Sequence, residues 1–598
     1  MKREIRSSTV AGMAGVGAVI DVGQESFVIP GIDTWKQHYL RPVDMPRLSA
    51  RLGKSLKAPI AENPVLMVRR FPRAMFCERC RRLVTWKTEM EKPDSAPVCP
   101  HPGCRGRLVP MRFVIACENG HLDDVDWRYW AHSGPRGDRT CKERGKLSFR
   151  ISDSHRGNAG LESLSVHCAA CGSSRTLNGI TDRHQTEALF HKCSGHHPWK
   201  FGQPEACDAK PVILQRGATN LHYPVTLSAL DIPGGFAANE ADEYAGQIRG
   251  HRKYAKLLDR IRTGSQAAAE VIAILAEDIA EDVCCKTDTV MDVARAEAAG
   301  KVPGGGSTAM ARKALDQHTL LNEEWKTLEH ALENGGLKGA HFSAVPEPLA
   351  TGAPPWMQMM ISGILLAGRL REVRVYTGFQ RVKPGNPDAT VPPDAGAAGK
   401  WLPAAEVFGE GIVIRLDYER LEAWAGALPD AEKQRLGDLE NRRIAEDLAF
   451  LEPVDPVFIV VHTLSHLLLR RIIFECGYSS SALRERLYVS RADRYAAIMI
   501  YTADGDSEGS LGGLVRQGKQ DRLAQSFFEA IEQGEWCSAD PVCSETSGQG
   551  LGGFNRAACH ACSLVSETSC TAANTLMDRT LIYHPEWGLL RFLGKDPA

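Results

Sequence analysis

The sequence predicts a multidomain α+β protein with a zinc-ribbon-like N-terminal part, a helical middle and a mixed α/β C-terminal domain that holds a four-cysteine zinc site. Three observations support this fold class. The chain has 598 residues, which is too many for one hydrophobic core. Its 18 cysteines gather in groups towards both ends. Between these groups, stretches with helical periodicity follow stretches with strand periodicity.

Composition restricts the class of protein. Hydrophobic residues make up 43% and charged residues 24%, as in ordinary globular proteins. The net charge is −1, so DNA binding needs a local basic face or a partner. The best candidate for the roughly 20 apolar residues of a membrane span covers 457–473, and His462, His466, Arg470 and Arg471 interrupt it. We therefore expect a cytoplasmic protein that does not enter a membrane.

Changes in periodicity, together with glycine- and proline-rich stretches such as 383–399, divide the chain into five expected parts. These are a β element with an extended arm (1–75), a zinc-ribbon region (76–215), a mainly helical region (216–345), a mixed β region with a Pro/Gly loop (346–430) and a zinc-containing domain (431–598).

The first cysteine group has the spacing of a zinc ribbon. Cys77 and Cys80 form a C-x2-C pair, and Cys99 and Cys104 follow as a C-x4-C pair. Each pair can form a tight turn that presents two thiolates, and four thiolates complete a closed tetrahedral site. Disulfides are not expected in a reducing compartment, and isolated core cysteines would not recur at such short spacings. We expect a structural zinc ion here.

A second ribbon is expected on four later cysteines. Cys168 and Cys171 form another C-x2-C pair, while Cys193 and Cys207 follow at looser spacing. Neighbouring histidines are possible substitutes for these ligands.

A weaker pattern precedes the second ribbon. Cys117 and His121 are spaced C-x3-H, and His132 and Cys141 are spaced H-x8-C. These four residues could ligate a metal, although capping and packing roles are an equal alternative.

A run of arginines flanks the first ribbon and could contact phosphates. A solvated charge run is the alternative interpretation. The residues concerned are Arg69, Arg70, Arg73, Arg79, Arg81 and Arg82.

An apolar helix near the C-terminus carries His462 and His466 on one face. A metalloprotease helix would have glutamate after the first histidine, and Thr463 stands there instead. We expect half-buried histidines with satisfied hydrogen bonds, and keep a ligand or catalytic role as the alternative.

Three carboxylates follow a hydrophobic strand at alternating positions: Asp504, Asp506 and Glu508. They could hold Mg²⁺ for phosphodiester cleavage. They could equally cap the next helix and shape a turn, and this structural interpretation is preferred.

The last cysteine group predicts another zinc site. Cys559, Cys562 and Cys570 follow each other as C-x2-C-x7-C, and either Cys537 or Cys543 can supply the fourth thiolate.

These motifs resemble a known family. HTLSHLLLRR, ECGYSSSALRERLYV, YTADGDSEGSLGGLV, CSADPVC and ACHACSLVSETSC are similar to the C-terminal domain of unknown function in Mrf-type DNA repair helicases. Upstream, CERC, ACENGHLDDVDW, QRGATNLHYPVTLSALDIP and LREVRVYTGFQRV extend the likeness over most of the chain. The whole resembles the DrmB family, a core component of the DISARM anti-phage defence system.

The resemblance implies a partner and a site. The family pairs with DrmA, a helicase-like ATPase, in a DNA-binding complex that acts with DISARM methylation against phage DNA. It implies a four-cysteine zinc site on Cys543, Cys559, Cys562 and Cys570, with Cys537 as the substitute. No enzymatic activity is firmly attached to the C-terminal domain, so the ATPase would reside in the partner.

We therefore expect a non-catalytic DNA-binding and scaffold subunit with two to four zinc ions. The alternatives are a metal-dependent nuclease that uses Asp504, Asp506 and Glu508 with the two histidines, and an assembly platform without DNA contact.

Overall fold

The computed structural model divides into two compact units. The first unit comprises Met1–Val43, Lys54–Leu227 and Arg374–Ala405, and the second comprises Asp44–Gly53, Ser228–Val373 and Glu406–Ala598. The structure describes residues 7–595 except 13, 61–65, 93–94, 136, 144, 152–159, 201, 234–243, 245–247, 250, 264–268, 284, 300–316, 395–398 and 503–512. The expected fold class, a mixed α and β protein with several domains, is confirmed. The five-part division stays a prediction.

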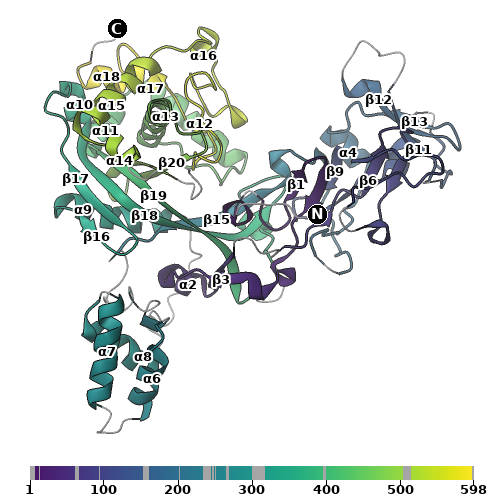
Figure 1. The fold of residues 1–598 in the computed structure, drawn as a ribbon. Helices are drawn as coiled ribbons and strands as arrows, with labels where there is room; N and C mark the ends of the chain where they lie inside the picture. Colours follow the sequence, from purple (N-terminus) through teal and green to yellow (C-terminus); the bar gives the residue numbers. More distant parts are fainter. Residues whose placement is uncertain are drawn as a thin grey trace. The chain divides into compact units, whose positions relative to one another are not determined.

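The first unit contains four three-stranded antiparallel sheets, drawn in purple and blue in Figure 1. Their strand orders are β1-β2-β5, β7-β6-β8, β10-β9-β14 and β11-β12-β13. The bounds are β1 Val19–Val22, β2 Glu25–Val28, β5 Arg69–Arg70, β6 Ala74–Cys77, β7 Leu83–Thr85, β8 Leu108–Pro110, β9 Phe113–Ala116, β10 Leu122–Asp124, β11 Leu147–Ile151, β12 Leu164–Cys168, β13 Ser174–Thr176 and β14 Val212–Gln215. Such short strands place a turn every few residues, and the cysteine pairs lie in these turns.

The first unit also contains three helices and a pair of antiparallel strands. They are the helices α1 Ser7–Val10, α3 Trp127–His132 and α4 Arg183–Leu189, and the strands β3 Leu40–Pro42 and β4 Ser55–Pro59. The strand β15, Tyr223–Leu230, follows β14. These two strands lie on either side of a polar turn.

A fully buried arginine at the end of β18 (Ile361–Gln380) stabilises the first unit. Arg381 Nε donates to the carbonyl of Gly120 at 3.0 Å, and Nη2 donates to that of Gly17 at 2.7 Å. Burial lowers the pKa of this guanidinium to about 9. Because Gly120 lies in the turn between Cys117 and His121, the arginine also fixes a candidate zinc site.

The second unit is built on a sheet with the order β16-β17-β18-β19-β21-β20. Its strands besides β18 are β16 Leu337–Lys338, β17 Ser343–Glu347, β19 Trp401–Leu416, β20 Leu483–Ser490 and β21 Tyr495–Thr502. The segment LREVRVYTGFQRV lies largely in β18, and EVFGEGIVIRLD lies largely in β19. Every residue of β21 is buried, which explains its unbroken apolar sequence.

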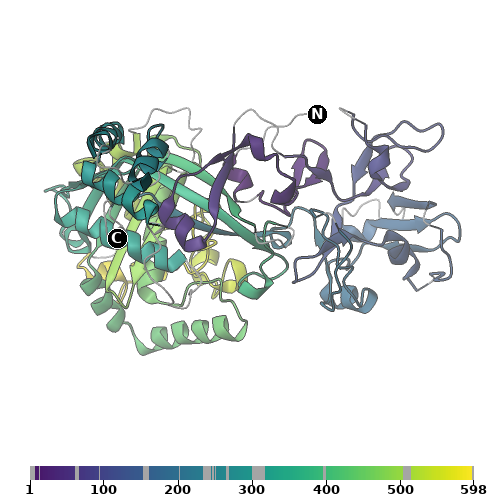
Figure 2. The same cartoon turned by 90° about the horizontal axis from the view of Figure 1, so that it is seen from below.

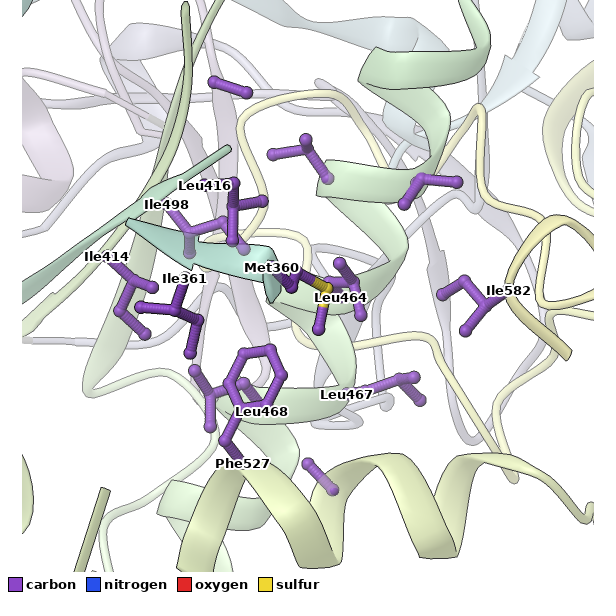
Figure 3. Packing of buried hydrophobic residues seen from close by; sticks show 14 of the residues in the cluster. Met360, Ile361, Ile414, Leu416, Leu464, Leu467, Leu468, Ile498, Phe527 and Ile582 are labelled. Carbon is purple, nitrogen blue, oxygen red and sulfur yellow. The ribbon is translucent and has the colours of Figure 1, made fainter. Parts of the chain in front are cut away.

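The helix α13, Pro456–Cys476, lies at the centre of the second unit. Asp455 caps its first turn by accepting from the N–H groups of Val457 and Phe458, and Gly477 ends it with a φ of 69°. Figure 3 shows leucines of α13 packed among residues of the sheet and of neighbouring helices. Those labelled are Met360, Ile361, Ile414, Leu416, Leu464, Leu467, Leu468, Ile498, Phe527 and Ile582.

By length and composition, α13 is also the one helix in the described part of the chain that could cross a membrane, and 72% of its apolar window is buried inside the protein. A helix that is apolar on all sides suits such a central position in a core.

Other helices cover this core or form a separate bundle. The helices that share the core of α13 are α10 Pro355–Met360, α11 Tyr418–Gly426, α12 Asp430–Ala445, α14 Gly513–Gln517, α15 Gln520–Gly534, α17 Thr580–Tyr583 and α18 Leu589–Phe592. The short helix α16 Val542–Glu545 lies in the C-terminal cysteine group. The second unit also includes α2 Pro46–Leu52 and α9 Gln317–Glu333. Figures 1 and 2 show α6 Tyr254–Thr263, α7 Ala269–Val283 and α8 Thr287–Ala298 side by side, around a small core of their own. The predicted helical middle is confirmed by these elements.

Candidate zinc centres

The first candidate centre is the predicted ribbon. Cys77 ends β6, and its sulfur lies 3.5 Å from that of Cys104, while the sulfurs of Cys80 and Cys99 are 3.7 Å apart. All four ligand atoms lie within 4.8 Å of one another. Tetrahedral zinc–thiolate bonds of about 2.3 Å place neighbouring sulfurs roughly 3.8 Å apart, so one ion fits.

The backbone of this centre favours thiolates. The N–H groups of Arg79 and Cys80 point at Cys77 Sγ at 3.4 and 3.5 Å. The N–H of Gly106 lowers the pKa of Cys104 to about 7, whereas burial raises that of Cys99 to about 12. A bound divalent cation supplies the positive charge that a buried thiolate requires.

The second centre combines residues from opposite ends of the zinc-ribbon region. Cys117 directly follows β9 and begins the turn to His121, and its sulfur lies 3.3 Å from His121 Nδ1 and 4.0 Å from Cys207 Sγ. Cys193 belongs to the same group of four. The side-chain amide of Asn119 donates to Cys207 Sγ at 3.4 Å, which stabilises a charged sulfur.

The third centre lies between α3 and the β12–β13 turn. His132 Nε2 is 3.2 Å from Cys171 Sγ, and the sulfurs of Cys141 and Cys168 are 3.9 Å apart. His132 Nδ1 lies 2.6 Å from the carbonyl of Arg128, to which it donates. This hydrogen bond leaves the lone pair of Nε2 free for a metal.

The second and third centres correct the predicted grouping. Cys168 and Cys171 were expected with Cys193 and Cys207, but the structure divides these pairs between two centres. Cys193 and Cys207 are joined by Cys117 and His121 in the second centre. Cys168 and Cys171 are joined by His132 and Cys141 in the third. The reason is a nested chain path, because the third centre lies, in sequence, inside the loop that the second centre closes.

The fourth centre is the C-terminal cysteine group. The sulfurs of Cys537 and Cys559 are 3.6 Å apart, and those of Cys543 and Cys562 are 3.9 Å apart. Both upstream cysteines are members, whereas Cys570, expected here from its spacing and from the resemblance, is not. The four cysteines of this centre thus come from a C-x5-C pair and a C-x2-C pair.

A buried arginine completes the surroundings of this centre. Arg579 Nη2 donates to Cys543 Sγ at 3.8 Å, and Nη1 donates to the carbonyl of Gly534 at 2.7 Å. Burial raises the pKa of the Cys543 thiol to about 12 and thus disfavours the thiolate. The hydrogen bond from Arg579 acts in the opposite direction, and a bound zinc ion would favour the thiolate further.

The two histidines predicted on the apolar helix, together with Cys570, form a fifth group. His462 and His466 lie on α13, fully buried rather than half-buried, together with Cys570 and with Glu485 of β20. Spacing alone did not indicate Glu485. One signal was present, because a carboxylate in an otherwise buried strand requires a polar or charged partner.

The predicted phosphate-contacting arginines fall into two sets. Arg70 pairs with Glu25 and Glu91, and Arg69 donates to the carbonyl of Lys200. Arg73 lies beside two aspartates, Asp123 and Asp124. Arg79, Arg81 and Arg82 are exposed on the first zinc turn, so the candidate basic face narrows to these three.

The carboxylates Asp504, Asp506 and Glu508 lie outside the described residues.

Comparisons with known proteins agree with this geometry. Residues 6–223 match a domain of unknown function, DUF8724, and residues 464–563 match the MrfA Zn-binding domain. The DISARM protein DrmB of Bacillus paralicheniformis is 29% identical over 590 residues, which cover 94% of this chain and 97% of that protein.

A solved structure, the DUF1998 helicase MrfA bound to DNA, is 10% identical with a TM-score of 0.18 and covers 40% of this chain and 25% of that one. The family match and the cysteine and histidine groups together show a protein with multiple zinc sites. Over nearly its whole length the chain resembles the DISARM protein DrmB, and its C-terminal part contains an MrfA Zn-binding domain with a four-cysteine cluster.

Proposed function

We propose that this chain is a non-catalytic, DNA-binding scaffold subunit of DISARM anti-phage defence, and that it acts in the cytoplasm beside a DrmA-like helicase ATPase. The observation that carries the proposal is the similarity to the DISARM protein DrmB over 94% of the chain. A reducing compartment suits the cysteines, because most of those that the structure describes lie in metal-ligand groups and none of the described ones forms a disulfide.

The zinc centres support a scaffold role. In each of the first four groups, four Cys or His side chains supply four ligand atoms, and a zinc ion with four protein ligands keeps no position open for water or substrate. Such ions stabilise turns, and in the first unit the turns carry the exposed arginines.

Exposed apolar side chains beside the fourth centre support a protein partner. Trp536 is 71% exposed and Val542 is 72% exposed, and each directly precedes a zinc-group cysteine. Exposed tryptophan is frequent where proteins bind each other. Co-purification of the chain with a DrmA-like ATPase tests this part of the proposal.

DNA binding is tested by fluorescence anisotropy of the full chain with a labelled random duplex over a salt series. We expect affinity to fall with salt, and the triple variant Arg79→Gln, Arg81→Gln, Arg82→Gln to lower the slope of log K against log salt by about 3, at about 0.9 per lost phosphate contact.

A matched control removes three exposed charges elsewhere, with Arg260→Gln, Arg262→Gln and Arg420→Gln. This control should bind like the unchanged chain. Absence of binding by the unchanged chain would favour the assembly platform, and equal losses in both triple variants would refute the assigned face.

The nuclease alternative keeps one direct test. Asp504→Asn with Asp506→Asn would abolish cleavage if those carboxylates hold Mg²⁺. His462 and His466 are each 0% exposed, so they lie out of reach of a DNA substrate.

A further inference from the structure

The fifth group of metal-ligand side chains lies inside the C-terminal core. His462 and His466 come from α13, Glu485 from β20, and Cys570 from the segment that follows the fourth zinc centre. The two histidines and the glutamate are each 0% exposed, and Cys570 is half-buried. Three separate parts of the chain therefore bring ligand atoms to one point.

The distances fit a single ion. His462 Nε2 lies 3.0 Å from His466 Nε2, 3.2 Å from Cys570 Sγ and 3.3 Å from Glu485 Oε1. His466 Nε2 lies 3.4 Å from the same carboxylate oxygen. Zinc bonds of about 2.0–2.3 Å in a tetrahedron place ligand atoms roughly 3.3–3.6 Å apart, so these separations are close to the edges of one coordination sphere.

The proton on His466 is fixed away from the centre of the group. Its Nδ1 lies 2.9 Å from the carbonyl of Ser563, to which it donates. In the neutral ring, Nε2 then carries a lone pair, and this lone pair faces the carboxylate of Glu485. Such a hydrogen bond between a histidine and a carbonyl is the usual support of a metal-bound imidazole.

Hydrogen-bond donors also surround the other two ligand side chains. Glu485 accepts from the hydroxyl of Ser465 at 2.6 Å and from the N–H of Thr571 at 3.2 Å. Cys570 Sγ accepts from the N–H of Ala572 at 3.3 Å. Acceptor atoms of His466, Glu485 and Cys570 thus face one another inside a core, which is unfavourable unless a cation lies between them.

Charge and ligand type select the cation. One thiolate, one carboxylate and two neutral imidazoles carry two negative charges, so a divalent ion makes the buried group neutral. Sulfur and imidazole ligands favour zinc over magnesium or calcium, which prefer oxygen. Four protein ligands leave no open position, as in structural sites.

We propose that His462, His466, Glu485 and Cys570 bind a structural zinc ion, separate from the four-cysteine centre, that joins α13, β20 and the segment 563–574. The two sites are adjacent in the chain, since Ser563 follows the zinc-group residue Cys562. The inference stands whether or not the chain binds DNA.

The test measures zinc per chain by elemental analysis on the full protein purified without chelator. Cys570→Ser and Glu485→Gln should each contain one zinc fewer than the unchanged chain. Two matched controls remove similar side chains outside the five groups, Cys476→Ser and His584→Gln, and should keep the full zinc content. Folded Cys570→Ser and Glu485→Gln proteins that keep every zinc ion would overturn the proposal.

A second measurement does not depend on how the variants fold. Anomalous scattering at the zinc edge, from crystals of the unchanged chain, should give a peak within bonding distance of Cys570 Sγ and both histidine Nε2 atoms. A peak at the four-cysteine centre without one here would refute the site.

Discussion

A fully buried ion pair joins Glu324 of α9 to Arg486 of β20. The guanidinium donates Nε to Oε2 at 2.7 Å and Nη2 to Oε1 at 2.8 Å, and the two side chains are 0% and 3% exposed. Glu324 also accepts from the N–H of Leu230 at 2.8 Å and from the hydroxyl of Tyr488 at 3.1 Å. Arg486 also donates to the carbonyl of Ser228 at 2.7 Å.

Removing one partner leaves the other charge buried and unpaired. We therefore expect Glu324→Leu and Arg486→Met to cost about 3–5 kcal/mol each. The double variant removes both charges of this pair. The buried carboxylate of Glu372, 3.9 Å from Arg486 Nη1, keeps its hydrogen bonds from the hydroxyls of Ser228 and Tyr501. The remaining loss is about 1–3 kcal/mol for each buried polar group that is left without a partner. Its destabilisation should fall at least 2 kcal/mol below the sum of the two single variants, as in coupled pairs.

Native-state hydrogen exchange suits this measurement, because it follows α9 and β20 separately in a multidomain chain. A loss of about 3 kcal/mol corresponds to a roughly 150-fold lower protection factor, at about 1.36 kcal/mol per tenfold. Arg494→Met serves as the control, since its pairs with Glu419 and Glu422 leave Arg494 46% exposed and solvent-screened surface pairs contribute little to stability. A double variant as destabilised as the sum of both singles would refute this reasoning.

Two further predictions concern the first zinc centre and the acid sensitivity of the C-terminal domain. A β-carbon on Gly106 would lie 2.6 Å from Cys77 Sγ, so Gly106→Ala should lose one zinc ion by elemental analysis, while Gly217→Ala, with open space around it, should lose none. Glu432 pairs with Arg435 and Arg556 at 2.6 and 2.8 Å. Burial raises its pKa, but both arginines together hold it below 4.5; the stabilisation is therefore complete above 4.5 and lost as pH falls through the lowered value. The difference in unfolding free energy between the unchanged chain and Glu432→Gln should shrink on acidification below 4.5, and a constant difference would contradict the pairing.

Local features of the fold could be predicted from the sequence. Cys77 and Cys80 occupy one turn, and Cys99 and Cys104 occupy another. The first zinc centre therefore depends on two short segments, and its four ligands could be predicted from their spacing. The boundaries of α13 were equally local, because Asp455 and Pro456 start the helix and Gly477 ends it.

Long-range features could not be predicted in this way. Glu485 reaches the histidines only because β20 packs against α13, and a single glutamate in a strand has no spacing that indicates a ligand. The same holds for Glu324 and Arg486, whose pairing depends on how α9 covers the sheet.

The nested second and third centres show how far spacing can be trusted. The outer loop, from His121 to Cys193, encloses 71 residues, and the inner centre, from His132 to Cys171, lies within it. With the inner ion bound, the flexible part of the outer loop is roughly halved, which lowers the entropy cost of closing it by about 0.6 kcal/mol. Chain entropy alone therefore favours the outer ion only about threefold.

Packing couples the two centres more strongly than chain entropy does. Phe113 of β9, beside the outer centre, and Val166 of β12, beside the inner one, belong to the same buried cluster, with Trp130 of α3 between the two in sequence. Loss of either ion would expose part of this shared core, at about 1.5–3 kcal/mol for each large side chain that returns to water. The shared core therefore explains why the two centres group the cysteines differently from the prediction. The fold places the turns of both centres around one set of apolar side chains, and each ion binds the thiolates that this core brings nearest.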